Sequence, residues 1–259
     1  ASDLASPHRG NEYSLRWFID LPRVKKRWLG LKMDLGAAYI EEPFETFDNI
    51  HNSAIGSHIN AALELFIYGK IKIGNNIDLK PGIGIQHYSN GAYQMPNSGV
   101  NIALIKATVV YHKYTKDIER KTLDFEKSKL KYYVGSSFGL KEITPIGGDK
   151  YGVVNIYGQV AKRVTPKSSF GGEIGLNYNE SLSHRQDEIE TGSGVAADNY
   201  RIYAAAQYQL HFDPFGIKFQ AGTYIAPKFT EDGALFFRYH VYYDYKHFQF
   251  FLGLKSHFA

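Results

Sequence analysis

Three residues whose side chains could together catalyse ester hydrolysis lie close together in the sequence: a histidine, a serine and an asparagine. His87 and Ser89 are two residues apart in the stretch IQHYSNGAYQMPNSGVN, residues 85–101, and Asn101 ends it. An imidazole can take the proton of a serine hydroxyl as the oxygen attacks a carbonyl carbon, and a third polar group can hold the ring in the required tautomer. Whether these side chains meet depends on the elements that carry them.

The dominant pattern along the chain is an alternation of apolar and polar residues, which is typical of β-strands. In residues 57–73, isoleucine, leucine and alanine fill most odd positions, and most even positions carry polar, charged or aromatic side chains. About twelve segments of this kind are expected. They are residues 12–20, 28–41, 57–73, 77–89, 99–113, 129–141, 151–164, 168–180, 198–212, 215–226, 234–245 and 247–258.

The length of these segments favours a membrane barrel over a soluble sandwich. Several exceed ten residues, aromatics make up 15% of the chain, and the apolar face often ends in Tyr, Phe or Trp. Strands of soluble sheets are usually shorter, whereas transmembrane strands place apolar residues on lipid and aromatics at the interfaces. We therefore predict an all-β fold: an antiparallel transmembrane β-barrel with about twelve visible strands, forming a single domain over residues 1–259.

The connections alternate in length, as they do in outer-membrane barrels. Short turns are expected near residues 74–76, 165–167, 213–214 and 246, and longer loops at 42–56, 90–98, 142–150 and 181–197. If the short turns are periplasmic and the long loops extracellular, the first and last of the twelve strands both have their free ends on the extracellular side. We therefore expect either a further strand near residues 114–128 or a complete barrel of about fourteen strands.

Composition excludes several other classes of function. The chain has no cysteine and a net charge of only +4, with lysine and arginine interspersed. A thiolate metal site is thus impossible, and a dedicated nucleic-acid binder is disfavoured. Asp187, Glu188 and Glu190 are interpreted as a solvated acidic loop. No metal site and no cofactor are expected, and the sequence identifies no protein partner.

Residue parity places the three candidate catalytic residues on one face. His87 and Ser89 continue the apolar side of residues 77–89, and Asn101 lies on the apolar side of the next segment. Because alternate side chains share a face, the three break the apolar surface at one place near the ends of neighbouring strands. Backbone N–H groups of the Asn90–Gly91 turn could stabilise a developing oxyanion there. An esterase whose nucleophile faces lipid would act on a lipid ester.

Two interpretations in which the chain is not an enzyme stay open at this point. Polar residues commonly decorate the interfacial rim of a barrel strand, and Asn-Gly is an ordinary turn signal. The chain would then be a non-catalytic outer-membrane barrel, either a channel or a component of an envelope complex. A soluble β-barrel that binds a lipid inside is a third alternative.

The stretch His87-Tyr88-Ser89-Asn90-Gly91, followed by Pro96-Asn97-x-Gly99-x-Asn101, resembles the active-site hairpin of the PagL-type lipid A deacylases. Further matches to the longer Bacteroidetes proteins known as acyloxyacyl hydrolases are FIDLP at 18–22, IGSHIN at 55–60 and KSH at 255–257. The resemblance is best over residues 12–112. It implies an integral outer-membrane enzyme of a Gram-negative bacterium that hydrolyses a fatty acyl ester of lipid A, the lipid anchor of lipopolysaccharide, without a cofactor.

The resemblance also implies roles for individual residues. Ser89 would be the nucleophile, His87 the general base, Asn90 and Gly91 would lie near the oxyanion, and Asn97 would shape the loop. One position departs from the family pattern, because Asn101 stands where the deacylases carry glutamate. An amide can orient the imidazole but cannot stabilise an imidazolium by charge, so slow catalysis, a carboxylate from elsewhere or a loss of catalysis are the three expectations.

Overall fold

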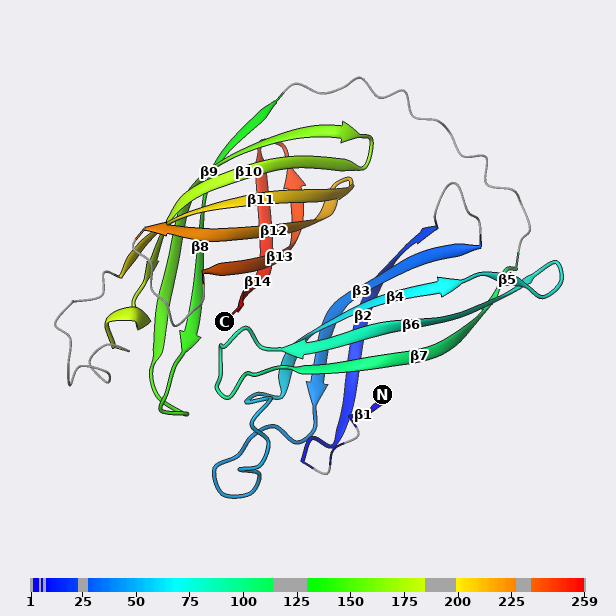
Figure 1. Ribbon diagram of the computed structural model, residues 1–259, viewed down its shortest axis with the longest axis horizontal. Coiled ribbons are helices and arrows are strands. Elements are labelled where there is room, and N and C mark those ends of the chain that lie inside the picture. The colour runs from blue at the N-terminus through cyan, green and yellow to red at the C-terminus, as the bar shows by residue number, and fades with distance from the viewer. Residues whose placement is uncertain are drawn as a thin grey trace. The chain divides into compact units, whose positions relative to one another are not determined.

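The computed structural model describes residues 2–4, 6, 8–22, 28–113, 130–184, 199–226 and 234–258. The chain divides into two compact units. Unit 1 comprises Ala1–Arg120 with Thr144–Gly147, and unit 2 comprises Lys121–Ile143 with Gly148–Ala259. Each unit is built around one antiparallel sheet, coloured blue to green in unit 1 and green to red in unit 2 (Figure 1).

Unit 1 holds a sheet of seven strands in which neighbours along the chain pair with each other. The strands are β1 (Ser2–Asp3), β2 (Asn11–Pro22), β3 (Leu29–Ile40), β4 (Ile59–Gly69), β5 (Ile71–Lys72), β6 (Ile77–Ser89) and β7 (Val100–Tyr111). Their order is β1-β2-β3-β4-β6-β7, with the short β5 also pairing with β6. The long connections of this unit, residues 41–58 and 90–99, lie at the same end of the sheet, because β3 and β6 are both antiparallel to β4 and both end there.

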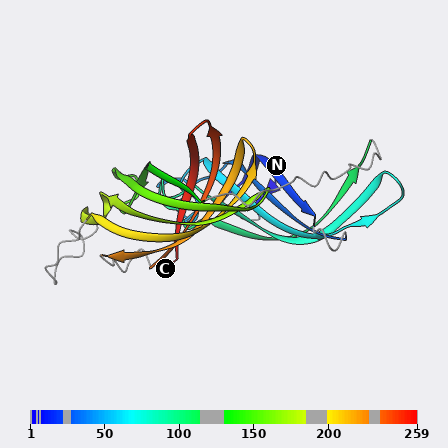
Figure 2. The ribbon, with the colours of Figure 1, turned by 90° about the horizontal axis from the view of Figure 1, so that it is seen from above.

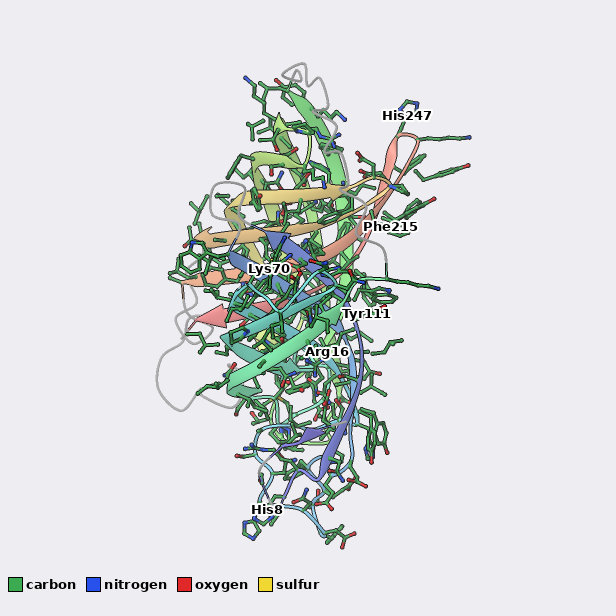
Figure 3. All side chains as sticks on the ribbon, turned by 90° about the vertical axis from the view of Figure 1, so that its right-hand side faces the viewer. His8, Arg16, Lys70, Tyr111, Phe215 and His247 are labelled. Carbon is green, nitrogen blue, oxygen red and sulfur yellow. The ribbon has the colours of Figure 1, made fainter. Side chains whose placement is uncertain are left out.

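Unit 2 holds a second seven-stranded sheet, which is a simple meander. Its strands are β8 (Lys131–Glu142), β9 (Lys150–Thr165), β10 (Ser168–Asn179), β11 (Tyr200–Phe212), β12 (Phe215–Ala226), β13 (Leu235–Tyr245) and β14 (Phe248–Phe258). They follow one another in the order β8 to β14, and the strands of both sheets bend along their length (Figure 2). Turns of two residues separate β9 from β10, β11 from β12 and β13 from β14. His247 marks the tip of the last of these hairpins (Figure 3).

Both sheets present apolar side chains to the surroundings and bury polar ones. We call these sides the apolar face and the polar face. On the apolar face, Ile105 is 92% exposed, Val134 89% and Leu252 83%. On the polar face, charged groups such as Glu64, Glu173 and Arg201 are buried. A soluble protein shows the opposite arrangement, so the distribution is that of strands whose apolar side faces lipid.

Buried polar contacts on each polar face reach across several strands and accompany the curl of the sheet. In unit 1, the guanidinium of Arg16 in β2 donates to Glu12, to Glu64 of β4 and to the hydroxyl of Tyr88 in β6. In unit 2, Arg238 of β13 contacts Glu173 of β10 at 2.8 Å. Paired charges of this kind are the condition under which such groups can be buried at all.

The structure confirms the predicted all-β, antiparallel class, and its two curled sheets are those expected of a β-barrel. Each of the twelve predicted segments contains one long strand, with ends that differ by a few residues. The predicted short turns are present, as are the long loops at 42–56, 90–98 and 142–150, whereas most of the predicted loop at 181–197 lies outside the described residues. Residues 114–128 and the acidic residues 187–190 lie outside the described residues, and the single domain over 1–259 stays a prediction. Among the described residues, no helix has the length and apolarity needed to cross a membrane.

Candidate active site

The candidate catalytic residues sit where the β6–β7 ladder ends. His87 of β6 is directly opposite Asn101 of β7, and Tyr88 opposite Val100 is the last pair of the ladder. Ser89 therefore has no partner in β7, although it pairs with Ala61 of β4 on its other side. The register places an imidazole, a hydroxyl and an amide side by side at one end of two strands. The predicted sharing of one face is thus confirmed.

The imidazole of His87 links the other two side chains. Its Nε2 lies 3.0 Å from Ser89 Oγ, and its Nδ1 lies 2.8 Å from Asn101 Oδ1. Because an amide oxygen only accepts hydrogen bonds, Nδ1 carries the proton and Nε2 is left to accept from the serine. This is the tautomer that a general base needs. Ser89 is only 9% exposed, so its hydroxyl has few competing contacts with solvent.

No carboxylate takes the third position in the part of the chain that the structure describes. Both ring nitrogens of His87 are occupied by Asn101 and Ser89, and no acidic side chain forms an ion pair with the ring there. Among the described residues Asn101 takes the position at Nδ1, and the three expectations for the missing glutamate stay predictions. The imidazole is oriented by a neutral amide.

A tight turn follows Ser89 and is built from left-handed residues. Gly91 has φ 68° and Ala92 has φ 63°. The hydrogens of Asn90 are fully used, since its backbone N–H donates to Asn97 Oδ1 at 2.9 Å and its amide group donates to Ser57 Oγ and to the Gln94 carbonyl, both at 2.8 Å. In this conformation Asn90 organises the turn and has no hydrogen left for an oxyanion.

Gly99 lets the second half of the hairpin approach the imidazole. It has φ +74°, and a Cβ there would lie 2.9 Å from His87 Cε1 and 3.2 Å from the Tyr88 carbonyl oxygen. Its N–H donates to the Ala54 carbonyl of the 41–58 connection at 3.0 Å. Sequence reasoning quoted Gly99 and Ser57 within motifs but gave neither a role, because their partners lie far away in the sequence.

A second serine–histidine pair lies in unit 2. Ser169 Oγ of β10 is 2.6 Å from His211 Nε2 of β11, and the hydroxyl of Tyr242 is 2.6 Å from His211 Nδ1. His211, Asp213 and Asp244 also offer ligand atoms within 4.8 Å of one another. However, both nitrogens of His211 are engaged and Asp213 pairs with Arg163 at 3.0 Å, an arrangement that opposes cation binding.

Comparison with known protein families covers both halves of the chain. Residues 11–109 match the family described as lipid A 3-O-deacylase (PagL), and residues 130–259, just over half of the chain, match the acyloxyacyl hydrolase C-terminal domain. No curated protein and no solved structure matches the chain. The first match contains β6 and most of β7, with His87, Ser89 and Asn101, and the second contains all of β8 to β14. The chain therefore belongs to the PagL-type family of lipid A deacylases.

Proposed function

We propose that the chain is an outer-membrane serine esterase that removes a fatty acyl chain from lipid A, the anchor of lipopolysaccharide. The observation that carries this proposal is the geometry at His87, which accepts from Ser89 at 3.0 Å and donates to Asn101 at 2.8 Å. A histidine held in this tautomer beside a hydroxyl is the arrangement that activates a serine nucleophile. Membership of a family of deacylases supplies the substrate class.

The reaction then follows from the positions of the three groups. Ser89 Oγ attacks the carbonyl carbon of the acyl ester while its proton passes to His87 Nε2. The tetrahedral intermediate collapses with cleavage of the ester C–O bond, and the departing alkoxide oxygen of lipid A takes that proton from Nε2 to leave as a hydroxyl. Water repeats the sequence on the acyl-enzyme, which releases the fatty acid and restores Ser89. Asn101 keeps the Nδ1 proton in place throughout and stabilises the imidazolium only by its dipole.

Donors for the oxyanion would come from the turn after Ser89. Among the described residues, the backbone N–H of Gly91 has no recorded protein acceptor. Asn97 uses its oxygen to hold Asn90, so its own amide hydrogens remain available for the same role. Such donors act on charge that develops only in the transition state, which is why they accelerate the chemical step.

The face on which Ser89 lies supports a lipid substrate. Strand neighbours on the same face include Ile83, Ile85 and Ile105, all exposed. An acyl chain lying along these side chains would bring its ester to the end of the ladder, where the polar groups are. Because the apolar residues are exposed and the charged ones buried, a soluble carrier with an apolar interior is disfavoured. A water-filled active site is disfavoured for the same reason.

The second candidate function is a barrel that retains the hairpin without catalysis. Asn101 favours it, because replacing the third-position carboxylate by an amide costs about 10⁴ in kcat in a serine protease. A channel or an envelope component would keep the geometry of β6 and β7 as a folding feature.

Mass spectrometry of lipid A separates the two candidates. Lipid A from cells that express the wild-type chain should lack one acyl chain, and cells that express Ser89→Ala should retain it. Loss of the acyl chain with both proteins would assign the nucleophile elsewhere. No loss with either, when both proteins are folded in the outer membrane, would favour the barrel without catalysis.

A further inference from the structure

The IGSHIN stretch at residues 55–60 is a sequence motif of unit 1 to which the catalytic arrangement assigns no role. It ends the 41–58 connection and leads into β4, which begins at Ile59. We propose that this 55–60 segment is a bracket that holds the turn after the nucleophile, and that Ser57 is a positioning residue for the deacylation reaction. The inference rests on the proposed function, because it assigns a role to Ser57 through Ser89.

The hydroxyl of Ser57 is fixed by two hydrogen bonds. It donates to the Ile59 carbonyl at 2.9 Å, so its lone pairs are directed elsewhere. One of them accepts the side-chain amide of Asn90 at 2.8 Å. Asn90 is covalently next to Ser89, and the hydrogen bond joins residues that are 33 positions apart in the chain. Ser57 thus restrains the peptide on which the nucleophile and the expected oxyanion donor of Gly91 both depend.

Each neighbour of Ser57 in the segment has a contact that keeps the bracket in place. Ile55 is fully buried in the cluster that also contains Tyr88 and Val100. A Cβ on Gly56 would collide with the backbone of Met95, so this position brings the segment against the 90–98 loop. Asn60, itself buried, donates to the Ser57 carbonyl at 2.6 Å.

His58 completes the bracket on its outer side. Its Nδ1 donates to the Ile40 carbonyl at 2.8 Å, and its ring stacks on Tyr39 at 5.0 Å between centroids. The Ile40 N–H in turn donates to the His58 carbonyl. The segment is therefore fastened to the end of β3 by the same residue that follows Ser57. A rigid second layer of this kind is what keeps catalytic groups within the narrow tolerance that catalysis requires.

The restraint matters because the turn after Ser89 is intrinsically unfavourable. Ala92 adopts φ 63°, a region that residues with a Cβ rarely occupy, and it follows Gly91 in the same conformation. Such backbone persists where surrounding contacts impose it, and it is common at catalytic sites. Asn90 helps to impose it by donating three hydrogen bonds, and Ser57 is the only one of these three acceptors that comes from outside residues 90–98 in the described structure.

The test measures the covalent reaction of Ser89 with a fluorophosphonate, whose phosphoryl oxygen occupies the place of the oxyanion. The purified full-length chain in detergent is labelled over a range of probe concentrations, which separates the limiting rate kinact from the binding term KI. Mass spectrometry of the digested protein locates the label. Ser57→Ala should lower kinact about fivefold to tenfold, as expected for one lost hydrogen bond, while KI changes less than about twofold.

Three further variants make the result specific. Ser57→Thr keeps the hydroxyl and should restore most of kinact. Ser98→Ala is the matched control, because its hydroxyl donates to the Ser53 carbonyl in the same loop cluster at 3.3 Å and does not touch Asn90; it should label like the wild type. Asn90→Ala combined with Ser57→Ala should label no more slowly than Asn90→Ala alone, because both changes remove the same hydrogen bond.

The outcomes distinguish failure of this inference from failure of the proposed function. Labelling of Ser89 at the same rate in the wild type and Ser57→Ala would overturn the bracket and leave the serine mechanism standing. Equal slowing by Ser57→Ala and Ser98→Ala would also overturn it, because the effect would then be one of loop stability. No labelling of Ser89 in the folded wild type would overturn the serine mechanism, and the role of Ser57 with it.

Discussion

The two serine–histidine pairs of the molecule have similar distances but different surroundings. In both, a serine hydroxyl lies within 3.0 Å of an imidazole Nε2 and a third polar group contacts Nδ1. Ser169 is the second residue of β10 and has ladder partners on both sides, Arg163 and Gln209, with a register shift between it and Ser168; it is 4% exposed on the polar face. Ser89 ends its strand on the apolar face and is followed by a left-handed turn.

This comparison shows what a serine–histidine contact requires in order to become a catalytic site. Beside a serine that has ladder partners on both sides, most backbone N–H groups are used in strand pairing. At the end of a ladder, the chain can turn and present donors that have no strand partner. The pair at Ser169 is therefore interpreted as a buried structural hydrogen bond, and the pair at Ser89 as the reactive one.

The most direct test of the difference between the two serine–histidine pairs is to replace each histidine by glutamine. His87→Gln should reduce lipid A deacylation by about 10³-fold or more, because the general base is lost, and should leave the thermal stability almost unchanged. His211→Gln should have the reverse profile, with activity retained and unfolding made easier by about 1–3 kcal/mol. Activity and melting temperature of both purified variants test this. A large loss of activity in His211→Gln with a folded protein would contradict the assignment.

The next largest effect is expected at Gly99. Gly99→Ala would place a Cβ against His87 Cε1 and would force a residue with a side chain into positive φ. Displacement of a catalytic ring by a few tenths of an ångström to an ångström costs up to about 10²-fold in rate. Gly147→Ala is the control, since Gly147 also has positive φ but a Cβ there meets nothing within 4 Å. Both should lose stability because of the positive φ, Gly99→Ala more because of its clash, and only Gly99→Ala should lose activity.

A gain of activity is expected when the neutral third residue becomes charged. Asn101→Asp keeps the length of the side chain and the oxygen that accepts from His87 Nδ1, and it adds a charge that stabilises the imidazolium. Deacylation should rise by about tenfold or more. Steady-state hydrolysis of a short-chain fluorogenic ester in detergent gives the number. An unchanged rate would mean that proton transfer to His87 does not limit the reaction.

The smallest effect is expected behind the active site, on the polar face. Tyr88→Phe removes the hydroxyl that accepts from Arg16 at 2.7 Å while the ring stays in place. We expect a stability loss of about 1–2 kcal/mol, with activity within about threefold of the wild type. Tyr111→Phe, at an exposed hydroxyl, is the matched control and should change neither quantity. Denaturant unfolding of the detergent-solubilised protein measures the difference.

The strands and the face of the candidate catalytic residues could be predicted because both depend on local alternation. In residues 77–89, the same two-residue period that defines β6 also fixes the side on which His87 and Ser89 emerge. Register with β7 then follows from the length of the hairpin loop. The pairing of His87 with Asn101 was therefore accessible from the sequence alone.

The remaining parts of the site depend on contacts between distant residues, which no local pattern encodes. The hydrogen bond between Ser57 and Asn90 joins two loops. That every N–H of Asn90 already has an acceptor can be seen only when the positions of all three acceptors are known. For residues 130–259, the sequence pattern indicated mainly barrel strands, and the match to an acyloxyacyl hydrolase domain assigned this half to a family as well. Its strands carry no motif whose chemistry could be read without the family.

The exposed apolar face around Ser89 has a consequence for how much affinity the site must provide. A substrate confined to one leaflet moves in two dimensions and is already oriented, with its esters at a fixed depth below the headgroups. Under the proposed function, a site at the end of β6 that opens sideways into that leaflet would meet esters at a high local density without extracting them. Weak and shallow binding is then sufficient, and an isolated serine at the end of a strand can serve where a soluble enzyme would need a deep pocket.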